Sequence, residues 1–212
     1  MIISHRHRFV FVAIPKTGTH AIRGALRRQL GAGDLEQVGL FVKKTFPFEP
    51  LARLKHGHIS LIQVRPFLGE PNFSSYFKFA FVRNPFDRFI SYCAFMTRAD
   101  NGFARDPQAV MRRFLFESRP LDHLLFVPQH TFITDERGAL LADAVGRVEN
   151  MQVAYDGYCE RLGLQSDPLA RVNSSQRGDY RLYYDNPMRD AVEEIYRGDL
   201  EMFGYDFEGQ AG

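Results

Sequence analysis

The chain has 212 residues, of which 45% are hydrophobic and 14% aromatic, so its composition excludes an intrinsically disordered protein and predicts a single globular domain over residues 1–212. A net charge of +2 gives no overall reason to expect nucleic-acid binding, and the two cysteines, Cys93 and Cys159, exclude a framework of disulfides. The charge is uneven, because residues 1–65 hold 11 Lys or Arg against 3 Asp or Glu, which favours an anionic ligand near this part of the chain.

The first patterned segment predicts a strand, a loop and a helix. Residues 9–14 form a continuous apolar run, typical of a strand covered on both faces, and residues 21–30 carry apolar side chains at helical spacing. Backbone N–H groups at a helix start, together with a lysine, a glycine and hydroxyls, attract an oxyanion such as phosphate. We therefore predict an anion-binding loop that contains Pro15, Lys16, Thr17, Gly18, Thr19 and His20.

This loop differs from the common nucleotide-triphosphate loop, because Lys16 precedes the only glycine, Gly18, instead of following a second one. On its own, the loop is equally consistent with a simple turn from a strand into a helix. A second segment is needed to decide between these interpretations.

Residues 31–69 link the first predicted helix to the next predicted strand. Residues 31–50 include glycines and prolines without a clear periodicity, which predicts a surface loop. Residues 51–69 predict two short helical pieces that meet at Gly57, and His56 and His58 flank this glycine.

A second strand, loop and helix follow. Residues 76–82 predict a buried strand that ends in Arg83, and Pro85 suits the first turn of a helix over residues 86–96, since its missing N–H is unpaired there in any case. Arg83 lies at the carboxyl end of a strand and Ser91 lies eight residues further on, so both can bind one phosphate. An isolated match of this kind is usually only a strand end with a capped helix, but its pairing with the first loop is less easily explained by chance.

The rest of the chain continues the alternation. We predict a helix over residues 107–117, a short strand over 144–148, and helices over 150–162 and 187–203. Alternating strands and helices predict an α/β fold, with a parallel β-sheet flanked by helices and the ligand at the carboxyl ends of the strands.

The two loops together resemble the motifs of the sulfotransferase family, whose sulfuryl donor is 3′-phosphoadenosine-5′-phosphosulfate (PAPS). The first loop is similar to the family's Pro-Lys-Thr-Gly-Thr segment, and Arg83 with Ser91 is similar to its later Arg and Ser. Two further segments, residues 146–150 and 199–205, resemble marks of the carbohydrate sulfotransferase branch, and the likeness extends over about residues 8 to 207. The absence of a predicted membrane span suggests the soluble bacterial type of this branch.

The resemblance implies a P-loop-like parallel β-sheet in a single domain and a PAPS site without a metal. In the family, the first loop binds the 5′-phosphosulfate, the later Arg and Ser bind the 3′-phosphate, and a polar loop closes over the nucleotide. Carried over to this sequence, the PAPS-binding residues are Pro15, Lys16, Thr17, Gly18, Thr19, His20, Arg83, Ser91, Asn173, Ser174 and Ser175. His20 departs from the pattern, since many members carry a hydroxyl there, and it can replace this contact or simply pack at the helix start.

An acceptor hydroxyl must lose its proton as it attacks sulfur, and a neutral imidazole suits that task. Residues 55–58 resemble the His-Gly-His segment of heparan uronyl 2-O-sulfotransferases, in which a histidine is the base. We predict His58 as the base, with His56 as the alternative, and Lys16 as the cation that neutralises the leaving phosphate. The resemblance points to a carbohydrate or glycolipid hydroxyl as the acceptor.

Two other functions remain open at this point. A small-molecule or nucleotide kinase also binds a phosphorylated adenine nucleotide, but its Gly-Lys-Ser/Thr order is not evident here. A non-catalytic protein that binds a nucleotide or a glycan has the same loops without turnover.

The apolar run at residues 9–15 is too short for a signal-peptide core, and no later run approaches about 20 apolar residues, so we expect a cytoplasmic protein. No side-chain cluster has metal-ligand spacing.

Overall fold

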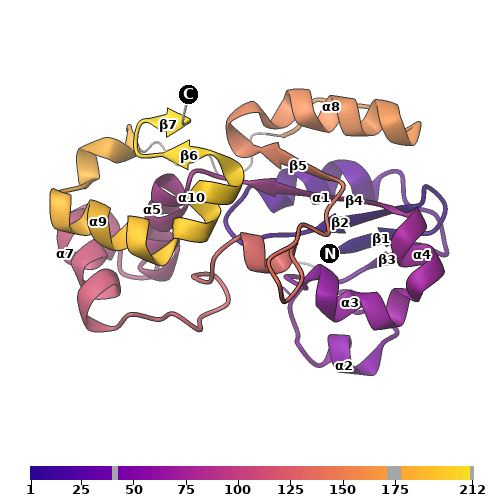
Figure 1. Ribbon diagram of the computed structural model, residues 1–212, viewed down its shortest axis with the longest axis horizontal. Helices are drawn as coiled ribbons and strands as arrows, with labels where there is room; N and C mark the ends of the chain where they lie inside the picture. The colour runs from indigo at the N-terminus through magenta and orange to yellow at the C-terminus, as the bar shows by residue number, and fades with distance from the viewer. Residues whose placement is uncertain (40–42, 171–177, 211–212) are drawn as a thin grey trace. The chain divides into compact units, whose positions relative to one another are not determined.

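The computed structural model describes residues 1–39, 43–170 and 178–210 (Figure 1). The chain divides into two compact units. The described residues of 1–82 and 131–172 form the first unit, and those of 83–130 and 173–212 form the second. That residues 1–212 act as one sulfotransferase domain therefore stays a prediction.

The first unit contains a five-stranded sheet with the strand order β3-β1-β2-β4-β5. Its strands are β1 (Ile2–Ser4), β2 (Phe9–Val12), β3 (Leu35–Glu36), β4 (Phe77–Val82) and β5 (Ala144–Arg147). β2, β4 and β5 are parallel neighbours, whereas β1 pairs antiparallel with both β2 and β3. The predicted α/β fold with a parallel sheet is confirmed, and the antiparallel extension at one edge was not predicted.

Helices flank this sheet on both faces (Figure 1). They are α1 (Thr19–Arg27), α2 (Glu49–Ala52), α3 (Leu61–Leu68), α4 (Glu70–Ser75) and α8 (Met151–Leu162), the last preceded by a 3₁₀ turn (Val148–Asn150). β2 and β4 are buried along their whole length, and alternate residues of a strand point to opposite faces. Phe9, Phe77 and the other odd-numbered residues of these strands pack against α1 and α8 in one core.

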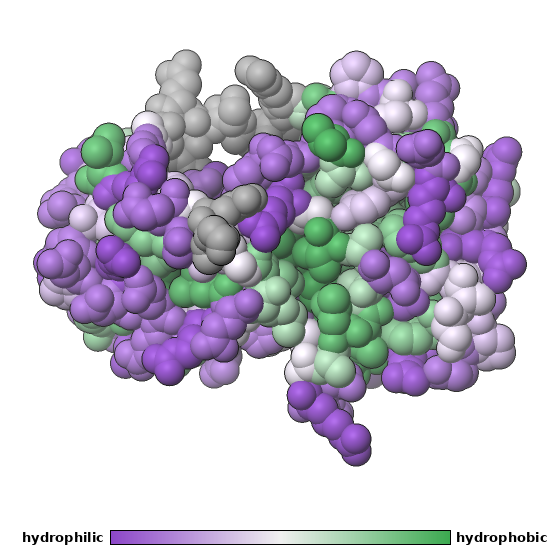
Figure 2. All heavy atoms as spheres, turned by 45° about the horizontal axis from the view of Figure 1, so that its top comes forward, coloured by the Kyte–Doolittle hydropathy of each residue, from purple (hydrophilic) through white to green (hydrophobic). Residues whose placement is uncertain are grey.

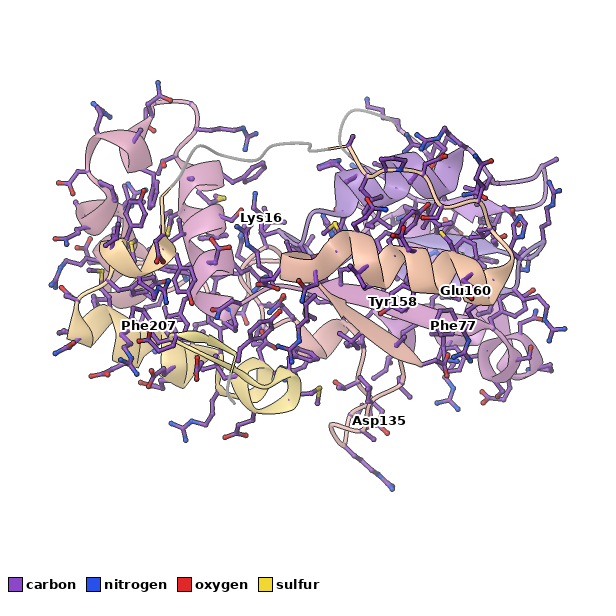
Figure 3. All side chains as sticks on the ribbon, turned by 90° about the horizontal axis from the view of Figure 1, so that it is seen from above. Lys16, Phe77, Asp135, Tyr158, Glu160 and Phe207 are labelled. Carbon is purple, nitrogen blue, oxygen red and sulfur yellow. The ribbon has the colours of Figure 1, made fainter. Side chains whose placement is uncertain are left out.

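The contact of α8 with β4 is aromatic. Tyr158 of α8 meets Phe77 edge to face with 5.7 Å between ring centroids, and it also packs on Phe79 at 5.1 Å (Figure 3). Tilted and edge-to-face pairs of this kind add to the stabilisation from burial alone. This contact holds α8 on the sheet, next to the strand that leads into Arg83.

The second unit is helical apart from a two-stranded ribbon. It contains α5 (Pro85–Met96), α6 (Gly102–Arg105), α7 (Pro107–Arg112), α9 (Asn186–Ile195), α10 (Arg197–Phe203), β6 (Tyr205–Asp206) and β7 (Gly209–Gln210). A π-helical turn (Arg113–Glu117) continues α7, and 3₁₀ turns lie at His130–Phe132, where the chain crosses from the second unit to the first, and at Tyr180–Tyr183. Its core is rich in aromatic side chains, among them Phe86, Phe89 and Tyr196.

Most predicted elements are confirmed, and three differ. Residues 31–50, predicted as a surface loop, include β3, which pairs with β1. The helix predicted over 187–203 consists of α9 and α10, because Tyr196 leaves the helical conformation between them (φ −110°, ψ 21°). The two helical pieces predicted to meet at Gly57 instead end at Ala52 and begin at Leu61. The histidines that flank Gly57 therefore lie in a loop.

No helix in the described part of the chain has both the length and the apolar character needed to cross a membrane. Figure 2 shows a face on which hydrophilic side chains predominate and hydrophobic ones gather in smaller patches. Among the described large hydrophobic residues, Val153 on α8 and Leu182 are the most exposed.

Candidate functional site

The loop between β2 and α1 has an unusual backbone. Lys16 (φ 67°) and Gly18 (φ 69°) both adopt the left-handed conformation, while Thr17 between them does not. A lysine in this region is strained by its Cβ, and such strain is typical of ligand-binding loops. Loops with left-handed residues of this kind commonly present backbone N–H groups to an anion.

Gly18 is the N-cap of α1, so the loop leads directly into a helix start. A Cβ on Gly18 would lie 2.6 Å from Cε of Met151, the first residue of α8. Figure 3 shows Lys16 near this end of α8. The position therefore demands glycine for its conformation, and the approach of α8 leaves little space there. The amide groups of the first turn of α1 and the Lys16 side chain together provide positive charge for an anion.

The hydroxyl of Thr17 has a hydrogen-bond partner within this stretch of chain. Its side chain is fully buried, and its hydroxyl donates a hydrogen bond to the carbonyl of Ile14 (3.0 Å). This bond closes the loop on itself and fixes its shape. Thr19 at the start of α1 is also buried. Burial and the charges of Arg23, Lys16 and Arg27 lower the pKa of His20, which makes its imidazole neutral at pH 7.

His58 contacts the chain just before this loop. Its Nδ1 lies 2.6 Å from the carbonyl oxygen of Ala13, two residues before Pro15. Because a carbonyl only accepts, Nδ1 carries the proton and donates, and Nε2 keeps its lone pair. Burial lowers the pKa of His58 to about 3, and the Arg23 charge adds to this effect although the bond to Ala13 opposes it. The ring is therefore neutral at pH 7, and Nε2 is unprotonated and only weakly basic.

His56 lies beside His58, with 6.3 Å between ring centroids. Burial, followed by the charge of the amino terminus, lowers its pKa. Its Nδ1 is buried and has no hydrogen-bond partner within the described ranges of the chain. Its backbone carbonyl accepts a hydrogen bond from Nε2 of Gln37 (2.9 Å). Of these two histidines, His58 is the one whose ring is oriented by a hydrogen bond to the residues just before the anion-binding loop.

Gly57 permits the close packing of this pair. A Cβ there would lie 1.9 Å from the carbonyl oxygen of Gln37 and 2.7 Å from Nη2 of Arg23. Arg23, a buried residue of α1, donates from Nη2 to the carbonyl of Gly57 (3.3 Å), and burial lowers its pKa to about 10. The glycine is thus required for close approach and not, as we expected, as the joint between two helices.

The second predicted segment forms the start of α5. Asn84 caps the helix by accepting from the amide of Phe86 (3.0 Å). Arg83 donates from Nε to Oδ2 of Asp87 (2.6 Å), and the pair is closed by Nη2 at 2.5 Å. Ser91 follows Asp87 by four residues and is buried. Residues four apart share one face of a helix, so Asp87 and Ser91 lie on one face at the start of α5, beside the residue that follows β4.

The sheet register relates the two predicted segments along the chain. In the parallel pair β2 and β4, Val12 lies opposite Ala80. Both strands therefore end at the same edge of the sheet, and the chain continues from Val82 directly into Arg83. This is the edge at which parallel α/β sheets bind ligands.

Two buried residues that we did not predict fix Arg83. The side-chain amide of Gln129 bonds both backbone groups of Arg83, and the carboxylate of Asp199 bonds Gln129. Asp199 belongs to the segment that resembles a family mark, but nothing in the sequence links Gln129 to Arg83, because a buried glutamine is identified only by its tertiary partners.

Gly146 and the polar loop also belong to the segments that resemble family motifs. Gly146 lies in β5, where a Cβ would be 2.6 Å from Cε1 of Phe81, so the glycine is explained by packing. Asn173, Ser174 and Ser175 lie outside the described residues. No group of three or more His, Cys, Asp or Glu able to hold a metal ion occurs within residues 1–39, 43–170 and 178–210.

A comparison with family models matches residues 1–114 to the model described as the Sulfotransferase family. The matched region contains the loop after β2, the His56–His58 segment and the whole of α5. No match was found among curated proteins or among solved structures.

Proposed function

The chain belongs to the sulfotransferase family, and on this premise we propose that it transfers a sulfuryl group from PAPS to a hydroxyl of a carbohydrate or glycolipid acceptor. The observation that carries the proposal is the contact of His58 with the loop before Lys16. A base and an anion-binding loop joined by one hydrogen bond are what transfer from an anionic donor to a neutral hydroxyl requires.

The residues of the loop suit a phosphosulfate. Lys16 and Gly18 adopt the left-handed conformation, which is typical of loops whose N–H groups bind anions, and α1 adds its amino-terminal dipole. In the proposal, these N–H groups bind the equatorial oxygens, and the Lys16 ammonium neutralises the bridging oxygen. Thr17 supports the loop through Ile14. Arg83 and Ser91 bind the 3′-phosphate of the donor.

The reaction is an in-line displacement at sulfur. The acceptor oxygen forms a bond to sulfur while the bond between sulfur and the phosphate oxygen breaks, and adenosine 3′,5′-bisphosphate leaves with the bonding electrons. The acceptor proton passes to Nε2 of His58, whose tautomer is fixed by Ala13. The negative charge of a bound donor near His58 raises the pKa of this histidine from its low value and makes it a stronger base during the reaction.

The acceptor class rests on the likeness of residues 55–58 to the His-Gly-His segment of carbohydrate sulfotransferases. The excess of basic residues in the first third of the chain is compatible with an acidic sugar chain. The oxygen that accepts the sulfuryl group must reach Nε2 of His58 within hydrogen-bond distance, about 2.6–3.2 Å.

Transfer of ³⁵S-labelled sulfate from PAPS to a panel of polysaccharides, glycolipids and small alcohols tests the proposal. We expect labelled product with at least one sugar-containing acceptor, formed at least about a hundredfold more slowly by Lys16→Ala. A kinase would instead bind ATP with magnesium and phosphorylate an acceptor. Tight binding of adenosine 3′,5′-bisphosphate without transfer to any acceptor would identify a non-catalytic binder and refute the proposed reaction.

A further inference from the structure

The backbone of Arg83 is held by a side chain from a distant part of the sequence. Oε1 of Gln129 accepts from the Arg83 amide (2.9 Å), and Nε2 of Gln129 donates to the Arg83 carbonyl (2.9 Å). β4 ends at Val82, so the ladder of that strand no longer provides partners for the next residue. The amide of Gln129 replaces them and extends the ordered backbone by one residue.

Gln129 is itself fixed by a buried carboxylate. Asp199 of α10 and Gln129 are both fully buried. Oδ2 of Asp199 accepts from the backbone amide of Gln129 (2.8 Å) and from its Nε2 (3.3 Å). Because a carboxylate only accepts, it orients the side-chain amide with Nε2 towards itself and towards the Arg83 carbonyl. The orientation of Gln129 is therefore set by charge and not by packing alone.

The other oxygen of Asp199 holds the next residue. Oδ1 accepts from the backbone amide of His130 (2.8 Å) and from its Nδ1 (2.7 Å). The ring of His130 packs on Gly198, where a Cβ would lie 2.7 Å from Cε1. Arg88 of α5, also buried, donates to the carbonyls of Leu125 (3.3 Å) and Val127 (2.9 Å). The segment that ends in Gln129 and His130 is thus fixed from both α5 and α10.

The side chain of Arg83 is constrained as well. Asp87 bonds Nε at 2.6 Å and Nη2 at 2.5 Å, so the plane of the guanidinium is set by a carboxylate one helical turn away. Backbone and side chain of this arginine are each held by a separate group. A site whose arginine is already ordered before the phosphate binds avoids an entropic cost.

We propose that Gln129 and Asp199 are positioning residues for Arg83, and that they preorganise it to bind the 3′-phosphate of the nucleotide. This inference rests on the proposed function, which assigns that phosphate to Arg83. Without that assignment, the network would be a structural link between α10 and the start of α5, and its loss would affect all ligands equally.

Titration calorimetry with adenosine 3′,5′-bisphosphate and with adenosine 5′-monophosphate separates these roles, since only the first nucleotide has a 3′-phosphate. We expect Gln129→Leu, which removes both bonds to Arg83 at similar size, to weaken binding of the bisphosphate by roughly ten- to a hundredfold, as misplacement of a binding group does. Binding of the monophosphate should change by less than about twofold on the same argument. Equal losses for the two nucleotides, or no loss for either, would overturn the inference.

Thr97→Val serves as the matched control. Thr97 is buried in the same unit and makes two hydrogen bonds, to the Cys93 carbonyl (2.9 Å) and from the Phe103 amide (3.0 Å), away from Arg83. We expect it to lower stability and to leave the preference for the bisphosphate unchanged. A loss of this preference in Thr97→Val would mean that destabilisation alone explains the Gln129 result and would overturn the inference.

Arg83→Ala tests the assignment of the 3′-phosphate to Arg83 separately from the positioning role of Gln129. If this variant keeps the preference for the bisphosphate, then the assignment of Arg83 fails and the inference fails with it. If Arg83→Ala loses the preference while Gln129→Leu keeps it, then only the inference fails. The combined variant should bind no more weakly than Arg83→Ala alone. Should Gln129→Leu not fold, Gln129→Asn, which shortens the amide by one methylene, is expected to show a smaller loss in the same direction, and an unchanged preference in that variant contradicts the inference.

Discussion

At the scale of single residues, the proposed reaction depends on the charge of Lys16 and on the unprotonated Nε2 of His58. Lys16 lies in a strained left-handed conformation in the loop before α1. His58 is held by the carbonyl of Ala13 within the same stretch of chain. These two side chains give the most direct tests of the proposed chemistry.

We predict that Lys16→Met lowers kcat at least about a hundredfold, because removal of one preorganised charge from a transition-state site typically has that effect. The matched control is Arg53→Met, which removes an exposed cation paired with Glu49 in the same unit. Steady-state kinetics with saturating PAPS measure both variants. A kcat for Lys16→Met within about tenfold of the unaltered protein would contradict the role of Lys16.

Asparagine substitutions distinguish the roles of His56 and His58. An asparagine at position 58 can still donate to the Ala13 carbonyl from its Nδ2, but it provides no basic nitrogen. We predict that His58→Asn lowers kcat about a hundredfold or more with little change in the KM for PAPS, and that His56→Asn has the smaller effect. A larger loss of kcat in His56→Asn would make His56 the base.

At the scale of elements, the loop that carries His56 and His58 is packed between α1 and the Gln37 backbone. Its conformation is set by Gly57, whose missing side chain allows contact with Gln37 and Arg23. Nothing in the sequence pattern distinguishes this close approach from a flexible joint, because both favour glycine. The close contact of Gly57 with Gln37 and Arg23 predicts how a substitution of this glycine changes the stability of the protein.

We predict that Gly57→Ala destabilises the protein by about 2 kcal/mol or more, because the new Cβ overlaps a backbone oxygen that cannot move freely. Gly24→Ala is the matched control. Gly24 lies in α1, and a Cβ added there would meet no described atom within 4 Å, so alanine should stabilise the helix by about 0.5–1 kcal/mol. Urea unfolding of the two variants measures these opposite shifts, and equal effects would contradict the packing argument.

The depressed pKa of His58 predicts a pH dependence of stability. The folded pKa is about 3, below the ordinary histidine value of 6.5. Between these values the unfolded chain binds more protons than the folded chain, so stability rises with pH, by up to about 1.4 kcal/mol per pH unit for this group. The contribution is complete above about pH 6.5 and is lost as the pH falls towards 3. Unfolding curves for His58→Asn at pH 4 to 7 should show a shallower slope, and an unchanged slope contradicts burial of a neutral His58.

At the scale of the whole molecule, the sequence predicts the elements with continuous patterns. β2, β4, α5 and α8 lie within about two residues of their predicted bounds, because long apolar runs, Pro85 and helical periodicity mark them. The antiparallel strands β1 and β3 have only a few residues each, and such short strands form through their neighbours in the sheet.

Some residues of the candidate site are likewise predictable from the sequence, and others are not. The loop motif predicts where Lys16 and Gly18 lie, because a backbone conformation leaves a local signal in the sequence. The partners of Arg83 were not predictable, since Gln129 lies 46 residues from Arg83 and Asp199 lies 70 residues from Gln129 along the chain, and only the folded structure brings them together.

The central proposal is that the chain binds one activated-sulfate nucleotide and that Lys16 and Arg83 both contribute to its binding. Titration calorimetry of the intact chain with adenosine 3′,5′-bisphosphate tests it most directly. The account predicts one bisphosphate per chain, at least about tenfold weaker binding in both Lys16→Met and Arg83→Ala from the loss of a charge-assisted contact, and no comparable binding of ATP with magnesium. Unchanged binding in either variant, or equal affinity for ATP with magnesium, would contradict it.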